Sequence, residues 1–213
     1  MNALITGLAD FALAATCLVC SWKLWSQSAP RKDLNRNFFG VFTATAVAAI
    51  AGGLRHSYPA ASAVHMFTAL SASVLIFAGV AAYNVWLIDV QLLLGEKRSL
   101  RISRWVFRIL LVIYLATVWH HGHTFLTALA AYLPPTTVLF VIAFLRAMRA
   151  KNRFYFLGVA GLLVCFVAAG IEVSRFQLNS VYLTSDVLYD VFEGLGLWGV
   201  YLFGSRVSRL KSL

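Results

Sequence analysis

The sequence has few charged residues, since Asp, Glu, Lys and Arg together make up only 12% of its 213 residues. Intrinsic disorder requires low hydrophobicity and a high charge content, so this composition excludes a disordered chain. Hydrophobic residues make up 61% of the sequence, against roughly 45–50% in a typical soluble domain. An ordinary soluble domain is therefore excluded as well.

Cysteine is also scarce, and all three cysteines fall inside long apolar runs, at Cys17, Cys20 and Cys165. The pair Cys17 and Cys20 has CxxC spacing, but no strand precedes it as in a thioredoxin-like site. We interpret the three as small hydrophobic core residues. The sequence shows no internal repeat, which predicts a single membrane domain over residues 1–213.

Seven apolar runs of about 20 residues dominate the sequence, and this is the length that a helix needs to cross a bilayer. They cover residues 3–22, 38–55, 64–88, 104–120, 124–145, 154–173 and 186–204. The predicted fold class is therefore all-α: a polytopic membrane protein with a seven-transmembrane-helix bundle. Pro134 and Pro135 fall inside the fifth run and predict a kink or a break there.

The basic residues predict the orientation of the bundle. Sixteen of the 18 Lys and Arg residues fall in the connectors after spans 1, 3 and 5, the start of span 4 and the C-terminal tail; only Arg55 and Arg175 lie on the other side. The positive-inside rule then places the N-terminus outside and the C-terminus inside. A basic rim facing anionic lipid headgroups accounts for the net charge of +10, so we expect no nucleic-acid partner.

The same layout predicts the location and the partners. Short loops and the lack of a transit peptide favour the bacterial inner membrane. Membrane lipid is the expected partner, and a protein partner within the membrane is left open.

The outer half of the predicted bundle collects most of the polar residues that can bind a ligand. Asp186, Asp190 and Glu193 are spaced i, i+4 and i+7 in span 7 and share one helix face. Three acids within two turns of a membrane helix require protonation, pairing or a bound cation. The run predicts a metal, proton or substrate site, with a hydrogen-bonded structural network as the alternative.

His56 ends span 2, and we expect it at the membrane depth of Asp186, because span 2 ends and span 7 begins at the outer interface. These three side chains would supply ligands from two helices and leave an open position where a metal ion activates water. One histidine with two carboxylates also suits iron(II), manganese or magnesium. The sequence therefore predicts a divalent metal on His56, Asp186 and Asp190.

The layout of seven spans, with a histidine ending span 2 and an i, i+4 pair opening span 7, resembles the superfamily of alkaline ceramidases and adiponectin/progestin receptors. In that superfamily one histidine of span 2 and a His-x-x-x-His pair of span 7 hold a zinc ion that hydrolyses lipid amides. The resemblance implies that His56 is the first ligand and that Asp186 and Asp190 replace the paired histidines, with zinc the first candidate metal. Gly52 stands where the superfamily has serine, and the outer half of span 3 has no aspartate.

The resemblance leads to the hypothesis of a metal-dependent hydrolase of a lipid amide or ester, with Asp10 or Glu193 as the general base. The alternative hypothesis is a non-catalytic membrane protein that binds a lipid or a small cation, or that is a subunit of a larger complex. A retinal protein is excluded because span 7 has no lysine.

Three further features have structural or functional interpretations. His120, His121 and His123 form a second candidate metal locus or cap the span ends. Glu172 and Arg175 are spaced for an i, i+3 ion pair. Tyr132 is assigned to an interfacial aromatic belt.

Overall fold

The computed structural model describes residues 2–57, 64–94, 99–121, 125–150, 153–179 and 182–210. Over these residues the chain forms seven α-helices and one isolated β-bridge between Asn179 and Leu183. The helices are α1 (Asn2–Trp25), α2 (Lys32–Ser57), α3 (Val64–Leu94), α4 (Ser99–His121), α5 (Phe125–Ala150), α6 (Arg153–Ser174) and α7 (Ser185–Val207). Each predicted apolar run corresponds to one helix, so the all-helical fold class is confirmed.

Five of these helices, α1, α2, α3, α5 and α6, are long and apolar enough to cross a membrane. The chain is thus an integral membrane protein. The remaining two helices, α4 and α7, are each 23 residues long, which at 1.5 Å per residue gives about 35 Å. Arginines near the start of α4 and three acids in α7 make these two helices less apolar.

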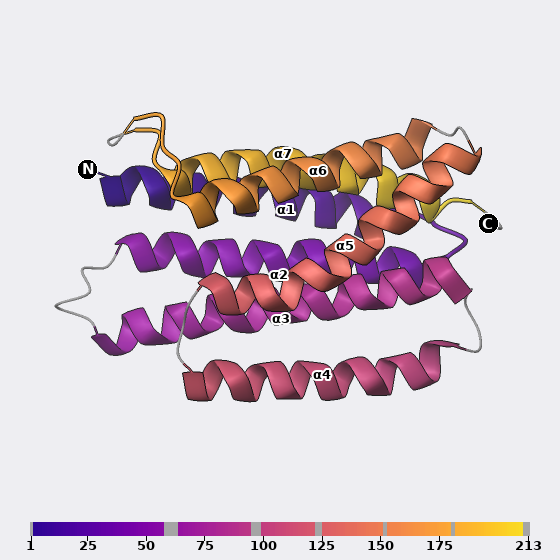
Figure 1. Cartoon of the computed structure of the whole chain (residues 1–213), viewed down its shortest axis with the longest axis horizontal. Coiled ribbons are helices and arrows are strands. Elements are labelled where there is room, and N and C mark those ends of the chain that lie inside the picture. Colours follow the sequence, from indigo (N-terminus) through magenta and orange to yellow (C-terminus); the bar gives the residue numbers. More distant parts are fainter. Residues whose placement is uncertain are drawn as a thin grey trace.

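Six of the helices form a closed ring. Helix α1 packs against α2 and α7, α2 against α3, α3 against α5, α5 against α6, and α6 against α7. Helix α4 lies outside this ring and packs against α3 (Figure 1). The ring, and not the full set of helices, therefore encloses the interior of the protein.

Glycines allow the closest helix contacts in the ring. A Cβ atom on Gly161 of α6 would lie 2.6 Å from the carbonyl oxygen of Gly196 of α7, and one on Gly53 of α2 would lie 3.1 Å from the carbonyl oxygen of Gly7. Small residues at helix interfaces let backbones approach where lipid gives no hydrophobic driving force. These glycines therefore allow α6 to pack closely on α7 and α1 on α2.

Helix α5 continues from Phe125 to Ala150 through both prolines, so of the two outcomes predicted there, a kink or a break, the break is absent. The hydroxyl of Thr136 donates to the carbonyl oxygen of Tyr132 at 2.7 Å, one turn earlier, which satisfies a backbone acceptor beside the prolines. The helix runs obliquely, from α3 at its start to α6 at its end (Figure 1). This oblique course places α5 across one side of the ring.

Large apolar side chains fill the half of the ring at which α2 begins and α7 ends. Phe38 of α2 and Phe203 of α7 are fully buried and pack edge to face, with ring centroids 5.9 Å apart. A Cβ atom on Gly204 would lie 2.7 Å from the ring of Phe38. This half of the ring is a tightly packed core, and the candidate site lies in the opposite half.

Candidate functional site

A cavity of about 540 Å³ lies inside the ring, in the half where α1, α3, α5 and α7 begin and α2 and α6 end. All six helices of the ring contribute to its wall. Most of the wall is apolar, formed by Leu13, Ala48, Val74, Leu75, Ala78, Ala81, Leu129, Leu133, Phe166 and Ala169, among others. A cavity of this size and lining is typical of a site for a small ligand.

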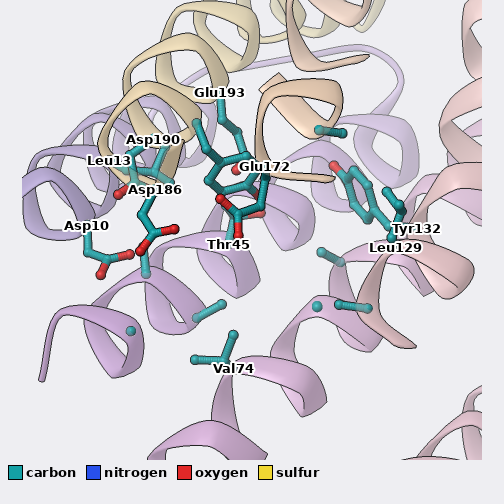
Figure 2. Close-up of a pocket in the computed structure, with 18 of the residues that line it drawn as sticks. Asp10, Leu13, Thr45, Val74, Leu129, Tyr132, Glu172, Asp186, Asp190 and Glu193 are labelled. Atoms are coloured by element: carbon teal, nitrogen blue, oxygen red, sulfur yellow. The ribbon is translucent and has the colours of Figure 1, made fainter. Parts of the chain in front are cut away.

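Five carboxylates lie together on this wall, and we call them the acidic end of the cavity: Asp10, Glu172, Asp186, Asp190 and Glu193. They come from α1, near the start of the sequence, and from α6 and α7, two consecutive helices near its end. Figure 2 shows them on one side of the cavity, with Leu129 and Tyr132 of α5 on the other side. Because ionisable side chains inside a membrane protein are costly, their convergence on one cavity identifies the candidate functional site.

Asp10 is held beside the end of α2. Its Oδ2 atom lies 3.8 Å from Nε2 of His56, and Nη2 of Arg55 lies 3.2 Å from the same His56 nitrogen. The absence of a side chain at Gly52 makes room for Asp10, since a Cβ atom there would lie 2.9 Å from Oδ1. Gly52 thus makes room for the carboxylate of Asp10, and Arg55 and His56 lie beside it.

Arg175 pairs two further carboxylates. Its Nη1 atom lies 2.7 Å from Oε1 of Glu172 and 3.4 Å from Oδ1 of Asp186. The ion pair with Glu172 confirms the i, i+3 pairing expected from the sequence. The pairing with Asp186 joins the end of α6 to the start of α7 across the connecting loop.

The last two carboxylates differ in their partners. Glu193 accepts a hydrogen bond from the side chain of Tyr189, one helical turn earlier. Asp190 is only 5% exposed, and among the described residues its carboxylate has neither a hydrogen bond nor an ion pair. The side chains that act on it electrostatically are all carboxylates. Asp190 is therefore a buried, unpartnered carboxylate on the cavity wall.

The structure brings all five residues of the predicted site to one cavity. His56, Asp186 and Asp190, the predicted metal ligands, and Asp10 and Glu193, the predicted bases, all line it. Within the described residues, however, no group of three or more His, Cys, Asp or Glu side chains is arranged to hold a metal ion. The side chains as placed do not fit a metal centre, although they share one wall.

Other site residues were missed or misassigned from the sequence. Tyr132 was assigned to an interfacial belt, but it lies on the cavity wall, as does Tyr189. Cys165 also lines the cavity, whereas Cys17 and Cys20 are buried in the core as expected. These positions depend on the rotation of each helix about its axis, which the apolar runs do not specify.

The second candidate metal locus falls largely outside the described part of the chain. His123 is not among the described residues, and nothing is described of the side chains of His120 and His121. The role of that cluster stays a prediction.

Comparison with known proteins gives one family match. No curated protein and no solved structure matches the chain. The model of DUF6962, a family of unknown function, matches residues 5–209, and the chain belongs to this family.

Proposed function

We propose that the cavity binds an amphiphile with a cationic headgroup, such as a long-chain amine taken from the surrounding membrane. The observation that carries this proposal is Asp190, a buried carboxylate on the cavity wall without a partner. A buried carboxylate is ionised only where a cation or further hydrogen bonds stabilise its charge, and otherwise it takes up a proton. A cationic headgroup beside Asp190 pairs with the ionised form and donates hydrogen bonds to it.

The rest of the cavity favours an apolar tail on the same ligand. Away from the acidic end, the wall is formed by alanine, leucine, valine and phenylalanine side chains of α2, α3, α5 and α6. Burial of an alkyl chain against such side chains contributes about 0.8 kcal/mol per CH₂ group. The ligand class is therefore one that combines a positive headgroup with a hydrocarbon tail.

An organic cation fits the arrangement of the acids better than a metal ion does. The carboxylates belong to three helices, and in the described residues no three ligands converge on one point. A metal ion requires such convergence at bond distances near 2 Å. An ammonium group is larger and is satisfied by hydrogen bonds at about 2.9 Å.

The test is a binding measurement on protein reconstituted in nanodiscs of zwitterionic lipid, with dodecylamine as the ligand and dodecanol as its uncharged counterpart. We expect saturable binding of the amine and at least tenfold weaker binding to the Asp190→Asn variant. Asp33→Asn is the matched control, because Asp33 lies at the other end of α2 and pairs with Arg104. Equal binding of amine and alcohol, or unchanged binding to Asp190→Asn, contradicts the proposal.

We further propose that all seven helices span the membrane, with the N-terminus outside and the C-terminus inside, in the bacterial inner membrane. The strong bias of Lys and Arg toward one end of the bundle supports this orientation. The similar lengths of α4, α7 and the five apolar helices support seven crossings. The acidic end then lies in the outer half of the bilayer.

A metal-dependent hydrolase of a lipid amide or ester, as the resemblance to the alkaline ceramidase and adiponectin/progestin receptor superfamily implies, is a second candidate. It is favoured by one observation, the common cavity wall of His56, Asp186 and Asp190. Binding of a divalent metal, with zinc the first candidate, requires these side chains to move together.

Elemental analysis of protein purified without chelators tests this second candidate. Near-stoichiometric metal in the wild type, lost both in His56→Ala and in Asp186→Ala/Asp190→Ala, supports the hydrolase and justifies assays with lipid amides and esters. A wild type without metal rejects it.

A further inference from the structure

We infer that Arg175 determines the charge of the ligand headgroup and restricts the cavity to ligands with a single positive charge. This inference rests on the proposed binding of a cationic amphiphile. It concerns the one cationic side chain that the acidic end receives from the loop between α6 and α7. Arg175 pairs with Glu172 and Asp186 and, among the described residues, leaves Asp190 without a partner.

Arg175 acts as a built-in cation at the acidic end. Its Nη1 atom is within 2.7 Å of Glu172 and 3.4 Å of Asp186, so both carboxylates already have a positive partner. Asp10 has His56 at 3.8 Å. Glu193 has the hydrogen bond from Tyr189. Of the five carboxylates, Asp190 is then the one with neither a hydrogen bond nor an ion pair in the described part of the chain, and one ammonium group is enough to pair it.

The backbone at Arg175 supports a role for its side chain. Among the described residues it is the one non-glycine residue with positive φ, at 54°. It ends α6, because its N–H donates to the carbonyl of Glu172 and the N–H of Phe176 donates to that of Ile171. Glycine is the usual residue at this position of a helix end, since it has no steric penalty there. The backbone of Arg175 is therefore strained, and in this conformation its guanidinium lies at the acidic end.

Removal of Arg175 changes the charge that the cavity presents. Glu172 and Asp186 would become available to a second ammonium group, next to the one at Asp190. The side chain of Asp186 is 39% exposed and that of Arg175 is 69% exposed, so water reaches these two side chains, whereas that of Glu172 is only 9% exposed. A ligand with two adjacent amines then gains an ion pair with Glu172 or Asp186, the two carboxylates that Arg175 occupies in the wild type.

The test compares dodecylamine, with one positive charge, and N-dodecyl-1,3-diaminopropane, with two, on the reconstituted full chain. For the wild type we expect the diamine to bind no tighter than the monoamine. For Arg175→Gln we expect the diamine to bind at least tenfold tighter than the monoamine, with monoamine affinity changed less than about threefold. Arg175→Lys, which keeps the charge, is the matched control and keeps the wild-type order.

The outcomes separate this inference from the proposed function. If both amines bind and their affinity ratio is the same in wild type and Arg175→Gln, the role of Arg175 is overturned and the proposed function stands. If neither amine binds to any variant, both are overturned. Should Arg175→Gln fail to fold, Arg175→Gly replaces it, because glycine adopts positive φ without strain, and the same affinity ratio is expected.

Discussion

Nε2 of His56 and Oδ2 of Asp10 lie 3.8 Å apart, and this contact joins the end of α2 to the first half of α1. Both side chains are largely shielded, with exposures of 24% and 15%. A partly buried pair contributes more than an exposed one, because water screens it less. Because Nη2 of Arg55 lies 3.2 Å from the same His56 nitrogen, the three side chains form one cluster at the acidic end, and we expect this cluster to contribute to stability.

A double-mutant cycle on this pair tests that contribution. We expect Asp10→Asn and His56→Gln each to lower the thermal unfolding midpoint in detergent, and the double variant to lower it by little more than the larger single change. The exposed pair of Asp33 and Arg104, 3.7 Å apart, is the control, and its removal changes the midpoint little. Additive effects at Asp10 and His56 would show that the two residues act independently.

A second prediction concerns the contact between α6 and α7. Gly161→Ala places a Cβ atom 2.6 Å from the carbonyl oxygen of Gly196 and 2.8 Å from the backbone nitrogen of Val200. The two helices must separate, and we expect a destabilisation of about 1–3 kcal/mol. Thermal unfolding followed by tryptophan fluorescence measures it.

Gly170 in the same helix is the matched control for this substitution. A Cβ atom at Gly170 meets nothing within 4 Å. Because alanine has the higher helix propensity, Gly170→Ala is neutral or stabilises the protein by up to about 1 kcal/mol. A similar loss of stability in both variants would contradict the close contact between α6 and α7.

The helices themselves were predictable from the sequence because each is a long apolar run, and a run of about 20 apolar residues is typical of a membrane-spanning helix. The exclusion of α4 from the ring was not predictable. The stacking of Trp86 on Phe107, with ring centroids 5.2 Å apart, and the hydrogen bond from Tyr114 to the carbonyl of Leu75 hold α4 against α3. Such contacts depend on the packing partners of each helix, which hydropathy does not reveal.

The membrane depth of the candidate site was predictable from the sequence, but the ion-pair partner of each carboxylate was not. Asp186 and Asp190 were placed near His56 because their helices begin and end at the same side of the membrane. The sequence did not show that Arg175 pairs with Asp186 or that Asp190 is left without a partner. The pairing depends on the positive φ of Arg175, and no residue type in this loop predicts that conformation.

The predicted orientation leads to a labelling experiment in intact bacteria, in a background with Cys165→Ala. Cys17 and Cys20 are fully buried and will not react with a membrane-impermeant maleimide. We expect Phe176→Cys, 51% exposed in the loop between α6 and α7, to react from outside the cell. Ser26→Cys, exposed between α1 and α2, will react only after the membrane is permeabilised. The opposite pattern would place the N-terminus inside.

The last prediction concerns two polar residues in the half of the bundle away from the cavity. Asp89 of α3 is 1% exposed, and neither carboxylate oxygen has a hydrogen bond in the described part of the chain. Asn35 of α2 is satisfied, since its Nδ2 donates to the carbonyl of Leu24 at 2.8 Å and its Oδ1 accepts from Gln27 at 3.4 Å. A buried ionisable group without a partner lowers stability, whereas a satisfied amide contributes to it.

We therefore expect opposite effects from removing the two groups. Asp89→Asn should raise the free energy of unfolding by on the order of 1 kcal/mol, because it removes a buried ionisable group that has no partner in the described part of the chain. Asn35→Ala should lower it by about 1 kcal/mol, because the carbonyl of Leu24 loses the 2.8 Å hydrogen bond from Asn35 and keeps only the 3.3 Å one from the N–H of Gln27. Thermal midpoints of the two variants in the same detergent provide the comparison. A lower midpoint for Asp89→Asn would contradict this expectation, because it would mean that the carboxylate of Asp89 has a stabilising partner.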